Sequence, residues 1–97
     1  MNYELGFLAA ALKEWRKLDE SVRRHFKTKL IERLAASEVP SARLSGSRNQ
    51  YKIKLRDAGY RLVYEVRNER LIVIVIAVGR RDKGQVYQSA ARRGIED

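Results

Sequence analysis

The sequence contains no cysteine and a single histidine, His25, in 97 residues. Without cysteine there are no disulfide bonds, thiolate nucleophiles or thiolate metal sites, and one histidine leaves little scope for a metal cluster. The longest apolar run, Leu71 to Val78, has eight residues, whereas a membrane-spanning helix needs roughly 20. The N-terminus does not resemble a signal peptide. We therefore expect a cytoplasmic protein with no cofactor, no bound metal and no membrane segment.

Positive charge, by contrast, is abundant, with 21 Lys and Arg against 12 Asp and Glu and a net charge of +9. The excess lies in two segments, since residues 43–61 hold six basic residues against one acidic and residues 80–93 hold five against one. This distribution favours a polyanionic partner such as nucleic acid. The length predicts one domain over residues 1–97.

The first half of the chain predicts a strand and two helices. Alternation at Tyr3, Leu5 and Phe7 predicts a short strand, and helical spacing follows from Leu8. We expect a first helix of about three turns and a second one that Asp19 caps and Pro40 follows. The two apolar stripes are Leu8, Leu12, Trp15 and Leu18, and Val22, Phe26, Leu30 (with Ile31) and Leu34.

The middle of the chain, residues 51–61, predicts a β-hairpin with one cationic face. Apolar and basic residues alternate strictly before a turn, which places them on opposite sides of a strand. With a two-residue turn at 58–59, the expected register pairs Arg56 with Arg61 and Lys54 with Val63, because a one-residue slip would mix the faces. The cationic face then holds Lys52, Lys54, Arg56 and Arg61.

The last third predicts a central strand and a basic end. A turn at residues 68–69 precedes the β-branched run 71–78, which is typical of a strand covered on both faces. We expect Gly79 to end this strand, residues 80–83 to form a charged loop, and residues 85–93 to form a short basic helix or tail. The resulting fold is α+β in β-α-α-β-β-β order, with a helical hairpin on one face of a mainly antiparallel sheet. A partner could cover apolar residues left on the other face.

A Lys and Arg row can bind phosphates, but RNA cleavage also needs groups that move protons. His25 belongs to a helix on the far side of the sheet, so we expect a structural role for it. Lys54 lies among like charges, which lower the pKa of a lysine. It is therefore the lysine best placed to lose a proton.

Five segments of the chain carry a family resemblance. They resemble the RelE toxins of type II toxin–antitoxin systems over nearly the whole chain, and Lys-x-Lys followed by Gly-Tyr-Arg-Leu-Val-Tyr is the most specific part. The segments are residues 11–18, 51–56, 59–64, 78–81 and 86–87.

The resemblance implies a ribosome-dependent endoribonuclease that cuts mRNA in the ribosomal A site and is neutralised by a RelB-like antitoxin. It implies Lys54 as general base, Lys52 and Arg61 on the phosphate, Arg81 at the leaving oxygen and Tyr87 stacked on a base. Arg81 is better suited to stabilise charge than to donate a proton, because guanidinium hardly deprotonates. The candidate contacts to messenger or ribosomal RNA are Arg43, Arg48, Arg56, Arg80 and Lys83.

Two other functions stay open on the sequence alone. One is a ParE-like gyrase inhibitor, a branch expected to lack the five site residues. The other is a non-catalytic RNA-binding or ribosome-binding module, for which basic faces suffice.

Overall fold

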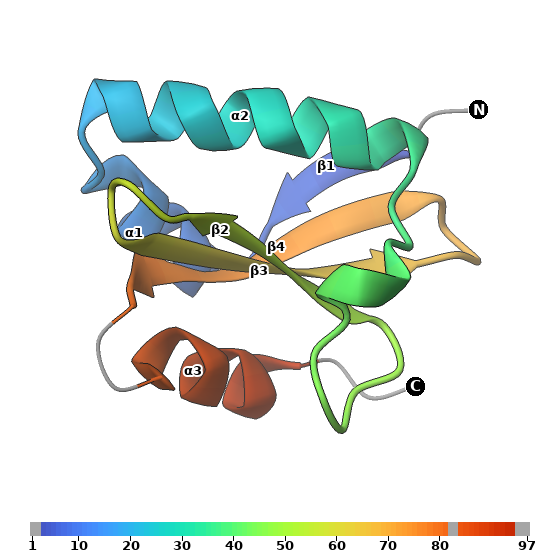
Figure 1. Ribbon diagram of the computed structural model, residues 1–97. Coiled ribbons are helices and arrows are strands. Elements are labelled where there is room, and N and C mark those ends of the chain that lie inside the picture. Colours follow the sequence, from blue (N-terminus) through green and yellow to red (C-terminus); the bar gives the residue numbers. More distant parts are fainter. Residues whose placement is uncertain (1–2, 82–83, 95–97) are drawn as a thin grey trace.

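A computed structural model describes residues 3–81 and 84–94. The predicted element order is confirmed, and the C-terminal segment is a helix (Figure 1). No helix in these ranges is long and apolar enough to cross a membrane. The elements are β1 (Glu4–Phe7), α1 (Ala9–Arg16), α2 (Glu20–Ala35), a 3-10 turn (Pro40–Ala42), β2 (Gln50–Leu55), β3 (Tyr60–Arg67), β4 (Ile72–Arg80) and α3 (Gln85–Arg93).

The four strands form one sheet in the order β1-β4-β3-β2. Only the β1–β4 pairing is parallel, so the sheet is mainly antiparallel, as predicted. Figure 1 shows α2 on one side of the sheet and α3 on the other. Strand β4 is therefore central and covered, as its continuous apolar sequence indicates.

The sheet separates two apolar clusters. The larger one packs α1 and α2 on the sheet through Phe26 and Leu30, which are fully buried, as the helical stripe predicts. The smaller cluster contains Val86 and Ala90 of α3, which cover apolar residues of β3 and β4. The C-terminal helix of the chain itself thus covers much of this face, which the sequence analysis left open to a partner.

A β-bulge in β4 decides which residues face α3. Val63 pairs with Ala77 and Tyr64 pairs with Val75, so Ile76 is an extra residue. Ile76 and Ala77 consequently both lie in the cluster under α3. The bulge shifts the alternation for the rest of the strand.

Gly79 does not end β4, contrary to the prediction, because the strand continues to Arg80. Gly79 pairs with Arg61 across the sheet. A Cβ at this position would lie 3.2 Å from Cγ2 of Val86. The glycine therefore gives Val86 of α3 room to approach the strand closely, and it does not break the strand.

The predicted register of the β2–β3 hairpin is wrong by two residues. Leu55 pairs with Tyr60 and Lys54 pairs with Arg61, so residues 56–59 form a four-residue turn. Gly59 has a φ of 72° and its N–H donates to the Leu55 carbonyl at 2.9 Å. A two-residue shift keeps every side chain on its face, and the alternation could not discriminate between the two registers.

The first helix is shorter than predicted, with eight residues in α1. The N–H groups of Lys17 and Leu18 donate to carbonyls three residues back, at 3.2 and 3.1 Å, which tightens and ends the helix. Leu18 is still buried in the core. In α2, Ile31 is 56% exposed and lies outside the buried stripe.

Candidate active site

The cationic face of the hairpin lies on the same side of the sheet as α3. Lys54 of β2 is directly opposite Arg61 of β3, which places their Cα atoms roughly 5 Å apart. Lys54 is exposed, whereas Lys52 and Arg61 are half-buried. Nη1 of Arg61 donates to the Tyr60 carbonyl at 3.1 Å. Arg56 lies in the turn instead of opposite Arg61, which corrects its predicted place in the row.

These like charges lower the pKa of Lys54 below its ordinary value of 10.5. The positive charge of Lys52 is the largest cause, followed by slight desolvation and the charges of Arg61 and Arg56. Lys54 therefore loses its proton to form the neutral amine more readily than an isolated lysine does. The predicted direction of this shift is confirmed.

A groove of about 920 Å³ extends from Lys52 to α3. Tyr87 lines it from α3, and the loop of residues 44–49 lines it from the other side. In Figure 1 this loop reaches to the same side of the sheet as α3. The structure thus brings Lys52 and Tyr87 to one groove, although they lie 35 residues apart in sequence. The full lining is Leu44, Ser45, Gly46, Ser47, Arg48, Asn49, Gln50, Lys52, Glu65, Tyr87, Ala91 and Gly94.

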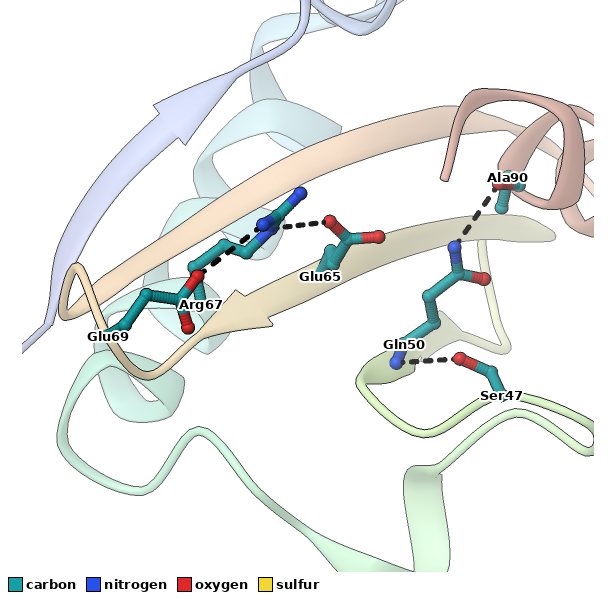
Figure 2. A network of polar contacts seen from close by, with 6 residues as sticks. All are labelled: Ser47, Gln50, Glu65, Arg67, Glu69 and Ala90. Carbon is teal, nitrogen blue, oxygen red and sulfur yellow. Dashed lines mark hydrogen bonds and ion pairs between the residues drawn. The ribbon is translucent and has the colours of Figure 1, made fainter. Parts of the chain in front are cut away.

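Gln50, which the sequence analysis did not identify, joins both walls of this groove (Figure 2). Its backbone N–H donates to Oγ of Ser47 at 3.0 Å, and its Nε2 donates to the Ala90 carbonyl at 3.3 Å. Gln50 is only 8% exposed. A single polar residue at the start of a strand carries no sequence signal for such a role.

Glu65 also lines the groove, and Figure 2 shows it beside Arg67 on β3. Nε of Arg67 donates to Oε2 of Glu65 at 3.0 Å, and Nη1 donates to Glu69 at 3.5 Å. Glu65 is therefore paired with a cation of its own strand. Across residues 3–81 and 84–94, no three His, Asp or Glu side chains gather closely enough to hold a metal ion.

Arg81 lies at the end of β4 next to the hairpin turn. Its backbone N–H donates to the Gly59 carbonyl at 3.0 Å, and its side chain is exposed. Arg80 instead places its Cζ 5.4 Å from the ring centroid of Tyr60. Tyr60 packs on the core beneath α1 and α2, so Arg80 lies on the opposite face from Lys54.

The remaining predicted contacts surround the site or lie outside the described residues. Arg48 lines the groove, and Arg43 is exposed and forms an isolated bridge with Tyr51. Lys83 lies outside the described ranges. His25 is exposed on α2, a helix on the far side of the sheet (Figure 1), as predicted.

Comparison with known proteins places this geometry in a family. Residues 5–84 match the family model described as the ParE toxin of type II toxin–antitoxin system, parDE. Over 93 residues the chain is 48% identical to the mRNA interferase toxin RelE of Escherichia coli strain K12, which covers 96% of this chain and 98% of that protein.

Solved structures agree with the sequence match. A doubly substituted free E. coli RelE has a TM-score of 0.91 at 46% identity, covering 98% of this chain and 100% of that one. The toxin in the intact E. coli RelBE toxin–antitoxin complex has a TM-score of 0.80 at 48% identity, covering 84% and 99%. The chain belongs to the RelE/ParE superfamily of type II toxins, and within it to the RelE branch.

Proposed function

We propose that this chain is the toxin of a type II toxin–antitoxin system and cleaves mRNA in the ribosomal A site. The observation that supports this most directly is the lowered pKa of Lys54 on a sheet face that it shares with Lys52 and Arg61. Such a face combines phosphate binding with a lysine that loses its proton more readily than an isolated lysine does. Relatives named mRNA interferase support the same activity.

In the proposed reaction, the neutral amine of Lys54 removes the proton of a 2′-hydroxyl, which attacks the adjacent phosphate. Lys52 and Arg61 hold the phosphate oxygens and stabilise the charge that develops on them. Arg81 stabilises the leaving 5′-oxygen, and water or a neighbouring group supplies its proton. Tyr87 stacks on a base in the groove, which orients the nucleotide for in-line attack.

The proposed partners are the ribosome, mRNA and a RelB-like antitoxin. Arg43, Arg48 and Arg56 are exposed on the groove rim and the nearby loops, where they can contact RNA phosphates. Arg80 and Lys83 stay candidates for the same role. Complexes of E. coli RelE with RelB support the antitoxin partner. The place of action that follows from these partners is the cytoplasm.

The proposal is tested by adding the toxin to a translation extract and mapping the 5′ ends of the mRNA. We expect cuts at fixed positions within the codon in the A site, and we expect Lys54→Ala and Arg81→Ala to abolish them. Lys29→Ala, on the exposed surface of α2, is the charge-matched control and should cut like the wild type. Inhibition of translation without cuts would instead indicate a binding module, and inhibition of gyrase would indicate a ParE-like poison.

A further inference from the structure

A neighbouring strand pairs with only part of one edge of β4. Strand β1 pairs with β4 from Ile72 to Val75 and then ends, and the Leu8 N–H donates to the Val75 carbonyl at 3.0 Å. Beyond that point, side chains take the place of a strand. Oε1 of Glu14 accepts from the Val78 N–H at 3.1 Å, and Nη1 of Arg93 donates to the Ile76 carbonyl at 3.0 Å.

Glu14 and Arg93 also bind each other through both arms of the guanidinium. Nη1 donates to Oε1 at 2.9 Å and Nη2 donates to Oε2 at 3.0 Å. Both side chains are partly buried, with 24% of Arg93 and 32% of Glu14 exposed. A two-point contact of this kind fixes direction as well as distance. The Glu14–Arg93 pair thereby joins α1, β4 and α3 at one point.

Apart from this pair, α3 contacts the sheet through a small apolar face, against which Tyr87 also packs, and through the bond from Gln50 to the Ala90 carbonyl. Two modest apolar side chains, Val86 and Ala90, are its buried residues on the sheet. Tyr87, Ala91 and Gly94 line the groove on one flank of the helix. Arg93 lies on the other side of Val86 and Ala90, since six residues, or about 600° of helical rotation, place it about 120° around the helix from Tyr87.

We propose that Glu14 and Arg93 are positioning residues for the cleavage reaction, because their pair sets the rotation of α3 and so holds Tyr87 in the groove beside Lys52. This inference rests on the proposed function. The bond from Gln50 to the Ala90 carbonyl holds the groove flank of α3, and the Glu14–Arg93 pair holds the other flank. Without the pair, α3 can turn and Tyr87 leaves its place.

The first test measures single-turnover cleavage of ribosome-bound mRNA at saturating toxin. We expect Arg93→Gln to lower the rate about tenfold, because a misplaced orienting group acts on the reaction rate and not only on binding. Arg92→Gln removes the same charge from the exposed face of α3 and should change the rate less than about twofold. Arg93→Lys, which keeps the charge but one arm only, should fall between them.

The decisive comparison repeats Arg93→Gln in a Tyr87→Ala background. If Arg93 acts through Tyr87, the second substitution lowers the rate by less than about twofold once the ring is gone. A full tenfold further loss would overturn the inference, since Arg93 would then act on the fold in general. A wild-type rate for Arg93→Gln alone would overturn it equally.

A second measurement needs no ribosome. Amide hydrogen exchange within α3 should become about tenfold faster in Arg93→Gln and in Glu14→Gln, while exchange in β2 and β3 stays unchanged. Unchanged exchange in α3 would overturn the inference even if the toxin is active. If the wild type fails to cut ribosome-bound mRNA, the proposed function falls, and the exchange data still decide whether the pair fixes α3.

Discussion

Lys54 is the residue on which the proposed chemistry depends, and its environment is made by other cations. Lys52 contributes most to its lowered pKa, with smaller contributions from desolvation, Arg61 and Arg56. Each of these charges disfavours the ammonium form of Lys54. The row of cations that can attract a phosphate therefore also favours the neutral amine of Lys54, the proposed general base.

The pH dependence of cleavage tests this relation. Replacing Lys52 by methionine removes the largest lowering effect, so the pKa of Lys54 rises and less neutral amine is present at any given pH. The pH–rate profile should move to higher pH in Lys52→Met, with a lower rate near neutrality. Single-turnover rates at saturating toxin, measured across the pH range in which the protein stays folded, give the midpoint.

Lys29→Met serves as control for this profile, because Lys29 is exposed on α2, a helix on the far face of the sheet. Its midpoint should match that of the wild type. If the midpoint for Lys52→Met stays in place or moves to lower pH, the group that titrates in the profile is not a Lys54 whose pKa is lowered by Lys52.

The sequence could predict the part of the site in which apolar and basic residues alternate strictly. The alternation around Lys52 and Lys54 placed both on one face, and the structure confirms this together with Arg61. Gln50 and Glu14 could not be predicted, because their roles arise from contacts with distant parts of the chain. Gln50 contacts Ala90, which is 40 positions away, and Glu14 contacts Arg93, which is 79 positions away. Only the packing of α3 on the sheet brings those residues together.

At the scale of elements, two features of the sheet escaped prediction for a common reason. A continuous apolar run such as residues 71–78 has no alternation, so the bulge at Ile76 leaves no trace in it. The hairpin register likewise has two solutions that preserve both faces, and the observed one closes through the bond from the Gly59 N–H to the Leu55 carbonyl. Alternation determines the face of a residue but not its position along the strand.

The contact between Gly79 and α3 provides a prediction at this scale. An alanine Cβ at 79 would lie 3.2 Å from Cγ2 of Val86, so Gly79→Ala should lower the free energy of unfolding by about 1 kcal/mol. Val86→Ala removes the opposing methyl groups. In that background Gly79→Ala should cost little more, and urea denaturation of the four proteins measures the difference. If Gly79→Ala lowers the free energy of unfolding equally with and without Val86→Ala, the predicted clash with the Val86 side chain is contradicted.

At the scale of the whole molecule, charge and fold divide the protein into two sides. One side carries the packed α1–α2 layer, and the other carries the cationic row, the groove and α3. The fold class and the element order followed from periodicity alone, since helices and strands differ in the spacing of buried residues. The groove could not be predicted from periodicity, because it forms where the loop of residues 44–49 meets the last helix.

The candidate site contains lysine, arginine and tyrosine but no histidine, and these are weak acids and bases near neutral pH. Orientation of the RNA must then supply much of the rate. A ribosome that holds mRNA in the A site can impose an in-line geometry that the small toxin cannot impose by itself. The central claim is therefore that cleavage depends on the ribosome.

The most direct test compares the single-turnover cleavage rate of one mRNA in two states, free in solution and bound in a programmed ribosome with an empty A site. We predict rapid cleavage at the A-site codon in the ribosome and slow or undetectable cleavage of the free RNA, with Lys54→Ala inactive in both states. Rapid cleavage of the free RNA by the wild-type protein would contradict the account.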